Sequence, residues 1–162
     1  MSVILYRVDE RLIHGQVVIG WGNQLRPDRY VVVDDELAAS DWEQDLYRLG
    51  AAGADVIFVG VDAARQRLAE WREADERSIL LTRDTTTMRR LAEGGTMRGE
   101  SVNLGGLRHG PGRKEALTYL HLSDEDMRDL KSMAEDGVEV SARDLPDAHR
   151  VGLESLTKSR WK

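Results

Sequence analysis

Short apolar runs alternate with longer amphipathic stretches along the whole chain. The apolar runs are rich in Val, Ile and Leu and are bounded by Gly, Asp or Pro, which is typical of strands covered on both faces. We expect strands at residues 3–8, 29–33, 55–61, 78–82, 100–104, 118–122 and 137–141. The stretches between them predict helices at residues 15–25, 41–51, 63–73, 86–93 and 124–135.

Residues suited to helix N-termini precede several of these helices. Ser40, Thr85 and Ser123 stand at N-cap positions. Ser40 has Glu43 three residues later and forms a capping-box pattern, whereas Ser123 has Asp126, a near match. Strands separated by helices imply right-handed crossovers and a largely parallel sheet. We therefore expect one α/β domain over residues 1–162, an open, mostly parallel sheet of about seven strands with helices on both faces.

Composition narrows the class of protein. A chain of 162 residues fits one domain with a sizeable core. The net charge of -6 argues against nucleic acid as a partner, because nucleic-acid binders usually carry a basic face. With no cysteine and four histidines at no metal-type spacing, we expect no disulfide and no metal site. Neither a signal peptide nor a membrane-spanning run is visible, so we expect a cytosolic protein.

One segment, RVDERLIHGQV at residues 7–17, carries most of the chemical information. It leaves the first strand and opens a helix, where open α/β sheets place their active sites. A neutral imidazole is a nucleophile, and arginines nearby can hold a phosphoryl group that it has received. We predict that His14 is transiently phosphorylated, with Arg11 and the N–H groups of Gly15 and Gln16 around the phosphate. Two partners must reach His14 in turn, so we expect an imidazole exposed at the rim of the sheet.

A second loop follows the strand at residues 100–104. Gly105 and Gly106 permit positive φ angles and a close approach of backbone N–H groups to an anion, and Asn103 adds a side-chain donor. A glycine pair alone equally fits a tight turn. Because loops after parallel strands leave from the same edge, we expect this one to meet the His14 loop and share its phosphate.

Other polar and aromatic residues leave alternatives open. Arg7 either pairs with an acid of its own turn, Asp9 or Glu10, or helps to hold the phosphoryl group. The acids at residues 34 and 35 either contact a partner or sugar or support the following helix, and Trp21 is more typical of core than of a ligand contact. The tripeptide Arg108-His109-Gly110 matches the signature of phosphoglycerate mutases. It lies too late in the chain for that role, but Arg108 remains a candidate for reaching the phosphate or an acidic partner.

The chain resembles the IIB component of the mannose/fructose/sorbose family of the bacterial sugar phosphotransferase system (PTS). Residues 7–17 match the signature R-x-D-[DE]-R-L-I-H-G-Q-V, and further matches are VVVDDELAA at 31–39 and SVNLGG at 101–106. A looser match continues through residues 122–126 and 137–140 to Pro146, so the similarity covers nearly the whole chain. One departure is Arg83-Asp84-Thr85, where related sequences often carry a proline-containing turn.

The resemblance implies a protein-Nπ-phosphohistidine–sugar phosphotransferase without a cofactor. In this family the residue matching His14 takes a phosphoryl group from a IIA protein and passes it to an incoming sugar. Arg11 would hold the charge of the phosphate, and Asp9 would orient the imidazole or Arg11. The family fold ends in an antiparallel strand. Membrane IIC and IID proteins would be further partners, which would place this chain in the cytoplasm at the inner face of the membrane.

Two other functions remain open from the sequence. A regulatory phosphoprotein of an incomplete phosphotransferase system would share His14 but would not serve transport. A plain nucleotide- or phosphate-binding module fits less well, because residues 9–14 contain no glycine-rich run. The sequence identifies no particular sugar, and it leaves a homodimer open.

Overall fold

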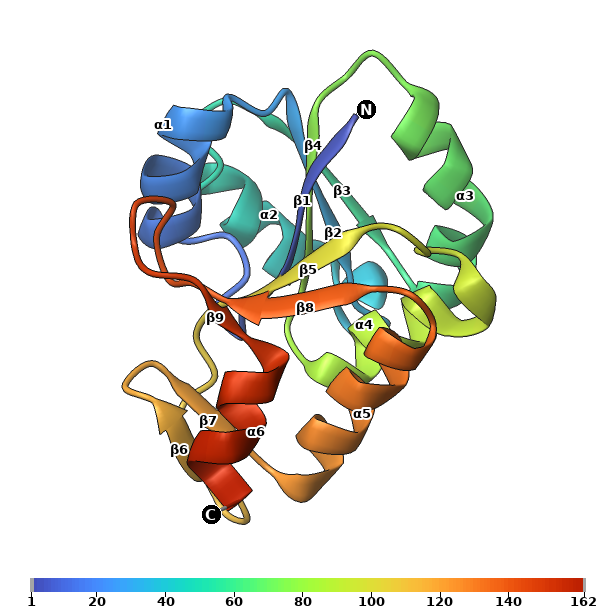
Figure 1. The fold of residues 1–162 in the computed structure, drawn as a ribbon. Coiled ribbons are helices and arrows are strands. Elements are labelled where there is room, and N and C mark those ends of the chain that lie inside the picture. Colours follow the sequence, from blue (N-terminus) through green and yellow to red (C-terminus); the bar gives the residue numbers. More distant parts are fainter. Residues whose placement is uncertain (1, 162) are drawn as a thin grey trace.

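A computed structural model describes residues 2–161 and contains two sheets (Figure 1). The main sheet has seven strands in the order β3-β2-β4-β1-β5-β8-β9. Neighbouring strands are parallel except for β9, which runs antiparallel to β8. A separate antiparallel hairpin consists of β6 (Lys114–Leu117) and β7 (Leu120–Leu122). The main-sheet strands are β1 (Val3–Val8), β2 (Arg29–Val33), β3 (Asp55–Val59), β4 (Ser78–Thr82), β5 (Ser101–Leu104), β8 (Glu139–Ala142) and β9 (Val151–Gly152).

Helices cover both faces of this sheet. The π-helix η1 (Gln16–Trp21), α1 (Gly22–Leu25) and α2 (Asp41–Leu49) lie on one face, whereas α3 (Val61–Glu73), α4 (Thr85–Ala92) and α5 (Asp124–Glu135) lie on the other (Figure 1). α6 (Leu153–Trp161) packs beside the β6–β7 hairpin. Two 3₁₀ turns, η2 (Leu37–Ala39) and η3 (Glu93–Gly95), complete the fold. No helix within residues 2–161 has the length and apolar character needed to cross a bilayer.

Two apolar clusters, one on each face, fix the central strands. On one face Val8, Leu80 and Leu104 pack with residues of α3, α4 and α5. On the other face Val32 and Leu81 pack with the loop after β1 and with η1. Because β2 and β4 are buried on both faces, their sequences are nearly unbroken apolar runs.

The predicted α/β fold with its antiparallel last strand is confirmed, but the seven strands are not all those expected. The predicted strand at 118–122 lies in the hairpin and not in the main sheet. The predicted strand at 137–141 corresponds to β8, which is parallel, and the antiparallel strand is β9. β6, β9 and α6 were not predicted. β9 has only two residues, and β6 carries the charged pair Lys114 and Glu115, so neither shows a strand pattern.

Ser40 and Ser123 stand at the predicted N-cap positions, whereas Thr85 does not. The Ser40 side chain makes no capping bond, so the capping box with Glu43 is wrong. The N-cap of α4 is Asp84, whose carboxylate accepts from the N–H of Thr87, because the Thr85 hydroxyl donates to acids of α5 instead. Ser123 forms a full capping box with Asp126, and this box fixes the start of α5.

Candidate active site

The candidate site lies where β1, at the centre of the sheet, meets β5. The chain leaves β1 for helices on one face, whereas the neighbouring β5 leads through the hairpin to α5 on the other face. Open α/β sheets bind ligands at such switch points. The two predicted loops meet here, since the N–H of Glu10 donates to the carbonyl of Gly106 at 3.0 Å and that of Gly105 donates to Val8 at 2.8 Å. Their predicted convergence is confirmed.

Arg7 is wholly buried, and its hydrogen bonds hold the residues of the site in position. The Nη2 atom of Arg7 donates to Asp9 Oδ2 at 3.1 Å, to Gln16 Oε1 at 2.9 Å and to the carbonyl of Asp144 at 3.2 Å. Burial lowers the pKa of Arg7, and the carboxylate of Asp9 opposes that shift. Of the two acids considered from the sequence, Asp9 is the one that pairs with Arg7.

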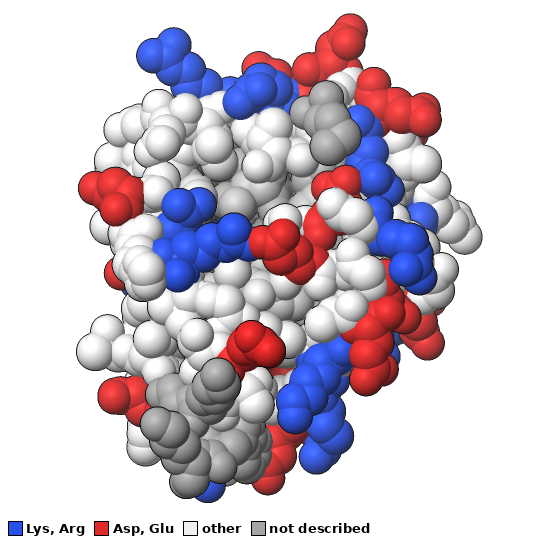
Figure 2. Space-filling model, in the orientation of Figure 1, with Lys and Arg blue, Asp and Glu red and all other residues white. Residues whose placement is uncertain are grey.

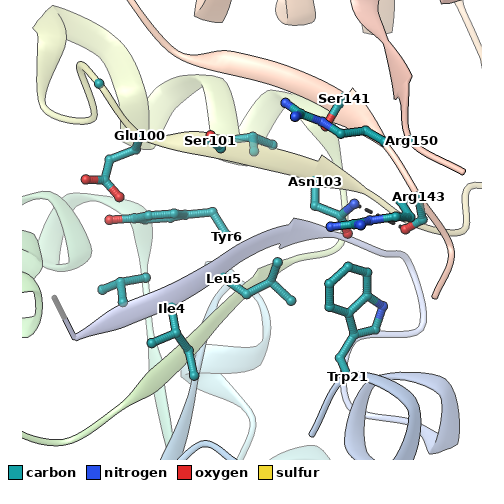
Figure 3. Close-up of a pocket in the computed structure, with 13 residues that line it drawn as sticks. Ile4, Leu5, Tyr6, Trp21, Glu100, Ser101, Asn103, Ser141, Arg143 and Arg150 are labelled. Atoms are coloured by element: carbon teal, nitrogen blue, oxygen red, sulfur yellow. Dashed lines mark hydrogen bonds between the residues drawn. The ribbon is translucent and has the colours of Figure 1, made fainter. Parts of the chain in front are cut away.

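The other side of this guanidinium is held by β5, β8 and η1. Arg7 Nη1 donates to Asn103 Oδ1 and, at 2.9 Å, to the carbonyl of Arg143, which also accepts from Asn103 Nδ2 at 3.1 Å. The buried ring of Trp21 lies 5.3 Å from the Arg7 guanidinium and 5.4 Å from that of Arg143. Figure 3 shows Asn103, Arg143 and Trp21 together at one end of a cavity of about 340 Å³ on the sheet. Trp21 therefore belongs to the support of the site.

Asp9 connects the buried support to the reactive groups. Its Oδ1 accepts from the backbone N–H of Arg11 at 3.1 Å and lies 3.7 Å from Arg11 Nε. Its Oδ2 accepts from Arg7 and from the N–H of Gly106 at 3.3 Å, and it lies 3.7 Å from His14 Nε2. Since this carboxylate is fully buried, its position is fixed by those contacts.

The imidazole of His14 is more enclosed than the sequence predicted. Its Nδ1 lies 2.9 Å from the carbonyl oxygen of Leu12. Since a carbonyl only accepts, this contact assigns a proton to Nδ1. Nε2 is buried and has no hydrogen-bond partner among the groups that the structure describes, and the His14 side chain is 16% exposed. The expectation of a bare imidazole is wrong, because buried Leu12, at a φ of 55°, aims its carbonyl at the ring.

Arg11 is the exposed cation of the site. Its side chain is 56% exposed, and Nη2 donates to Gln16 Oε1 at 3.3 Å. Beside it a cavity of about 330 Å³ opens between the Gly106 loop and the β6–β7 hairpin. Its lining residues are Glu10, Arg11, Gly106, Leu107, Arg108, Thr118, Tyr119 and His121. Burial raises the pKa of Tyr119 to about 12. The hairpin residues of this cavity were missed because no motif marks them.

The loop after β5 contributes differently from the prediction. The Gly105 and Gly106 N–H groups donate to Val8 and Asp9, and the Asn103 amide is engaged by Arg7 and by the carbonyl of Arg143. Neither glycine adopts the positive φ angle that it permits. What requires glycine is close packing, because a Cβ at Gly105 would lie 2.6 Å from Asp9 Oδ2.

The acids that end β2 have structural partners. Asp34 accepts from the N–H of Leu37 at 2.9 Å and from Arg83 Nε at 2.5 Å. Asp35 accepts from the N–H of Val61 at 2.9 Å and forms an ion pair with Arg90 at 3.3 Å. These contacts support the helix-supporting interpretation of both acids.

Acidic and basic side chains pair on the exposed surface around the site, so their charges largely cancel. Arg108 forms an ion pair with Glu10, at 3.4 Å between Nε and Oε2. Figure 2 shows basic and acidic side chains in neighbouring groups on the face that it presents. Within residues 2–161 no group of three or more His, Asp or Glu side chains is placed to hold a metal ion.

Comparison with known proteins gives one consistent family. Residues 3–162 match the family model described as "PTS system sorbose subfamily IIB component". The chain is 30% identical over 147 residues to the N-acetylgalactosamine-specific phosphotransferase enzyme IIB component 1 of Escherichia coli, covering 90% of this chain and 92% of that protein. It is 31% identical over 157 residues to the mannose-specific EIIAB component of the same organism, covering 96% of this chain but 48% of that protein.

Solved structures agree with these relatives. The crystal structure of manxB from Thermoanaerobacter tengcongensis superimposes with a TM-score of 0.87 at 29% identity, covering 99% of this chain and 98% of that one. The N-acetylgalactosamine-specific IIB component 1 from Escherichia coli superimposes with a TM-score of 0.84 at 29% identity, covering 93% and 98%. The family model spans the sheet, the His14 loop and the β6–β7 hairpin alike. The chain therefore belongs to the sorbose subfamily of PTS IIB components.

Proposed function

We propose that this chain accepts a phosphoryl group from a IIA protein on His14 and transfers it to a sugar during PTS-coupled uptake. The observation that carries the proposal is the arrangement of the signature residues. His14 stands at the carboxyl end of the central strand, and the buried carboxylate of Asp9 lies 3.7 Å from its Nε2 and 3.7 Å from Nε of the exposed Arg11. Phosphoryl transfer needs positioning and charge stabilisation more than covalent help, and these side chains supply both.

Two hydrogen-bond acceptors compete for the proton of the imidazole. The Leu12 carbonyl holds the proton on Nδ1. A proton on Nε2 would instead face Asp9 Oδ2, now 3.7 Å away, and would leave the lone pair on Nδ1. Phosphorylation at Nδ1, the Nπ atom of the family, therefore requires the ring to release Leu12 and to turn toward solvent. Asp9 acts as the orienting group for that tautomer.

The phosphoryl group is transferred in two steps. Nδ1 of His14 attacks the phosphorus, the P–N bond of the donor's phosphohistidine breaks, and the proton of His14 ends on the donor's imidazole. In the second step a sugar hydroxyl attacks, the P–N bond to His14 breaks, and the hydroxyl proton ends on the imidazole. Arg11 holds the phosphate oxygens, assisted by the N–H groups of Gly15 and Gln16, which begin the helix after His14 and have no carbonyl within it to bond.

The partners follow from this role. A relative whose name joins an A and a B component in one chain supports a IIA protein as the donor. Membrane IIC and IID proteins would deliver the sugar and hold this chain at the cytoplasmic face of the membrane. The relatives are named for different sugars, N-acetylgalactosamine, mannose, fructose and sorbose. We therefore propose the class of sugar substrates without choosing a member.

A labelling experiment tests the assignment of His14. Incubation with phosphorylated IIA should introduce acid-labile phosphate into the chain, and His14→Ala should abolish it. His149→Ala is the matched control, because this imidazole is exposed and lies in the segment between β8 and β9. Acid-labile phosphate retained by the His14→Ala protein would refute the proposal.

The regulatory alternative is separated by the second half of the reaction. Phosphorylated chain is mixed with vesicles containing the IIC and IID proteins and a panel of hexoses and amino sugars. Formation of a sugar phosphate supports transport. Full labelling of His14 without any sugar phosphate would favour a regulatory phosphoprotein.

A further inference from the structure

α2 presents an apolar stripe to solvent. None of its nine residues is buried, and the side chains of Trp42, Leu46 and Leu49 are 67%, 59% and 84% exposed. Their spacing of four and three residues places them on one face of the helix. Within the described part of the chain, the only other large apolar side chain exposed to this degree is Ile19 of η1. Exposed apolar side chains that gather in one place mark interaction sites.

The near end of this stripe forms one wall of a groove of about 400 Å³. The lining residues are Ile13, Trp42, Glu43, Leu46, Tyr47 and Arg83. Ile13 directly precedes His14, so the groove begins at the active-site loop. A protein that brings a phosphoryl group to His14 must cover the surface around this loop. The groove therefore continues the surface on which phosphoryl transfer takes place.

The charge of the groove and the access to His14 indicate which kind of partner binds there. A second copy of this chain on the groove would stand beside Ile13 and obstruct the approach to His14. The first turn of α2 carries the acids Asp41 and Glu43. Asp45, one turn later, pairs with Arg48, and Arg83 of the groove pairs with Asp34, so the first-turn acids set the sign of the charge at the rim. An acidic rim disfavours contact with the negatively charged lipid surface of the inner leaflet. It favours a soluble protein that presents apolar side chains within a basic rim.

We propose that the groove between α2 and the His14 loop, with Trp42 and Leu46 as its apolar contacts, is the docking site for the IIA phosphoryl donor. This proposal rests on the proposed function, because it needs a IIA donor for His14. Aromatic side chains in such a position commonly dominate binding energy. Arg83, which also lines the groove, is held in place by its ion pair with Asp34.

The test measures the initial rate of His14 labelling by purified, phosphorylated IIA protein of the same system as a function of chain concentration. The double variant Trp42→Gln/Leu46→Gln should raise the KM about tenfold or more, with the maximal rate within about twofold of wild type. Leu49→Gln is the matched control. It removes the most exposed apolar side chain of the same helix, but Leu49 does not line the groove, so its KM should stay near that of wild type.

Phosphoramidate, a small phosphoryl donor that needs no docking, separates this proposal from the proposed function. Equal labelling of His14 in wild type and the double variant by phosphoramidate, with the raised KM for IIA, supports the groove. An unchanged KM overturns the docking site but leaves the proposed function standing, and so does a KM raised equally by Leu49→Gln. If IIA fails to label even wild type, the proposed function falls and the docking site with it.

Effects on other partners also count against the proposal. Loss of self-association in the double variant, measured by sedimentation, with an unchanged KM for IIA would assign the groove to a second copy. Loss of sugar phosphorylation in IIC/IID vesicles with an unchanged KM for IIA would assign it to the membrane partners. Both results overturn the IIA docking site. Because the substituted side chains are mostly exposed, we expect the double variant to fold, which a melting curve checks.

Discussion

Gly105 provides a sharp test of how tightly the site is packed. A methyl group added there would lie 2.6 Å from Asp9 Oδ2 and closer still to the guanidinium of Arg7. Arg7 cannot move aside easily, because it is wholly buried and bonded to Asp9, Gln16 and two backbone carbonyls. We therefore expect Gly105→Ala to displace either the end of β5 or Arg7 itself.

Both outcomes are costly. Overpacking of a core costs about 1–3 kcal/mol, and each lost hydrogen bond to a charged group costs about 1.5–3 kcal/mol. We expect Gly105→Ala to lower the free energy of unfolding by about 3 kcal/mol. In a protein of this size 1 kcal/mol corresponds to about 2–4 °C, so the Tm should fall by about 6–12 °C. Because Arg7 positions Asp9 and Gln16, His14 should also be labelled more slowly by phosphorylated IIA.

Gly15→Ala is the control for stability. Gly15 has helical backbone angles, φ -53° and ψ -42°, and a Cβ there would have no neighbour within 4 Å. The free energy of unfolding of this variant should stay level or rise by about 0.4–1 kcal/mol. Its Tm should therefore not fall. If Gly105→Ala melts within a degree of wild type and is labelled at the same rate, Arg7 has room to move and the reasoning is refuted.

Three further predictions concern other parts of the fold. Burial raises the pKa of Tyr6 above its ordinary 10.0, so the unfolded chain loses this proton first and stability should fall above pH 10. Between pH 10 and pH 11 the free energy of unfolding of Tyr6→Phe, measured by chemical denaturation, should rise relative to that of wild type by up to about 1.4 kcal/mol. An unchanged difference between the two proteins would contradict this prediction. Arg7→Lys keeps the charge but loses the planar fork. The free energy of unfolding of Arg7→Lys, measured in urea, should be lower by about 1–3 kcal/mol. The variant should also lower the maximal labelling rate more than it changes the KM for IIA. Labelling kinetics equal to those of wild type would exclude a positioning role for Arg7. Ser123→Ala removes the capping box of α5 and should cost about 1 kcal/mol by thermal melting, whereas an equal loss in Ser40→Ala, whose side chain makes no cap, would count against this account.

The sequence predicted the central sheet because burial on both faces leaves an unmistakable apolar run. The strands of residues 29–33 and 78–82 have the bounds expected. The hairpin and β9 escaped prediction because their pairing depends on contacts distant in the chain. Leu120 and Leu122 are buried against the core of the large sheet, although they pair with β6.

The active-site loop was located from its residues, but its geometry was not. Spacing along the chain indicated that Asp9, Arg11 and His14 would gather at the end of β1. It did not indicate that Leu12 would adopt a left-handed conformation and direct its carbonyl at the imidazole. Nor did it show that Asn103 would serve the buried guanidinium of Arg7. Such details depend on packing from β5 and β8, which no local pattern records.

The π-helix η1 fixes the position of Trp21 relative to His14, which precedes this helix. Trp21 closes this six-residue segment and stacks near Arg7 and Arg143. Deleting one residue between Val17 and Gly20 would turn the indole around the helix axis and away from the two guanidinium groups. The loop would keep every signature residue, yet the guanidinium beneath would lose its aromatic neighbour. In this protein the number of residues between His14 and Trp21 is therefore as much a requirement as their identity.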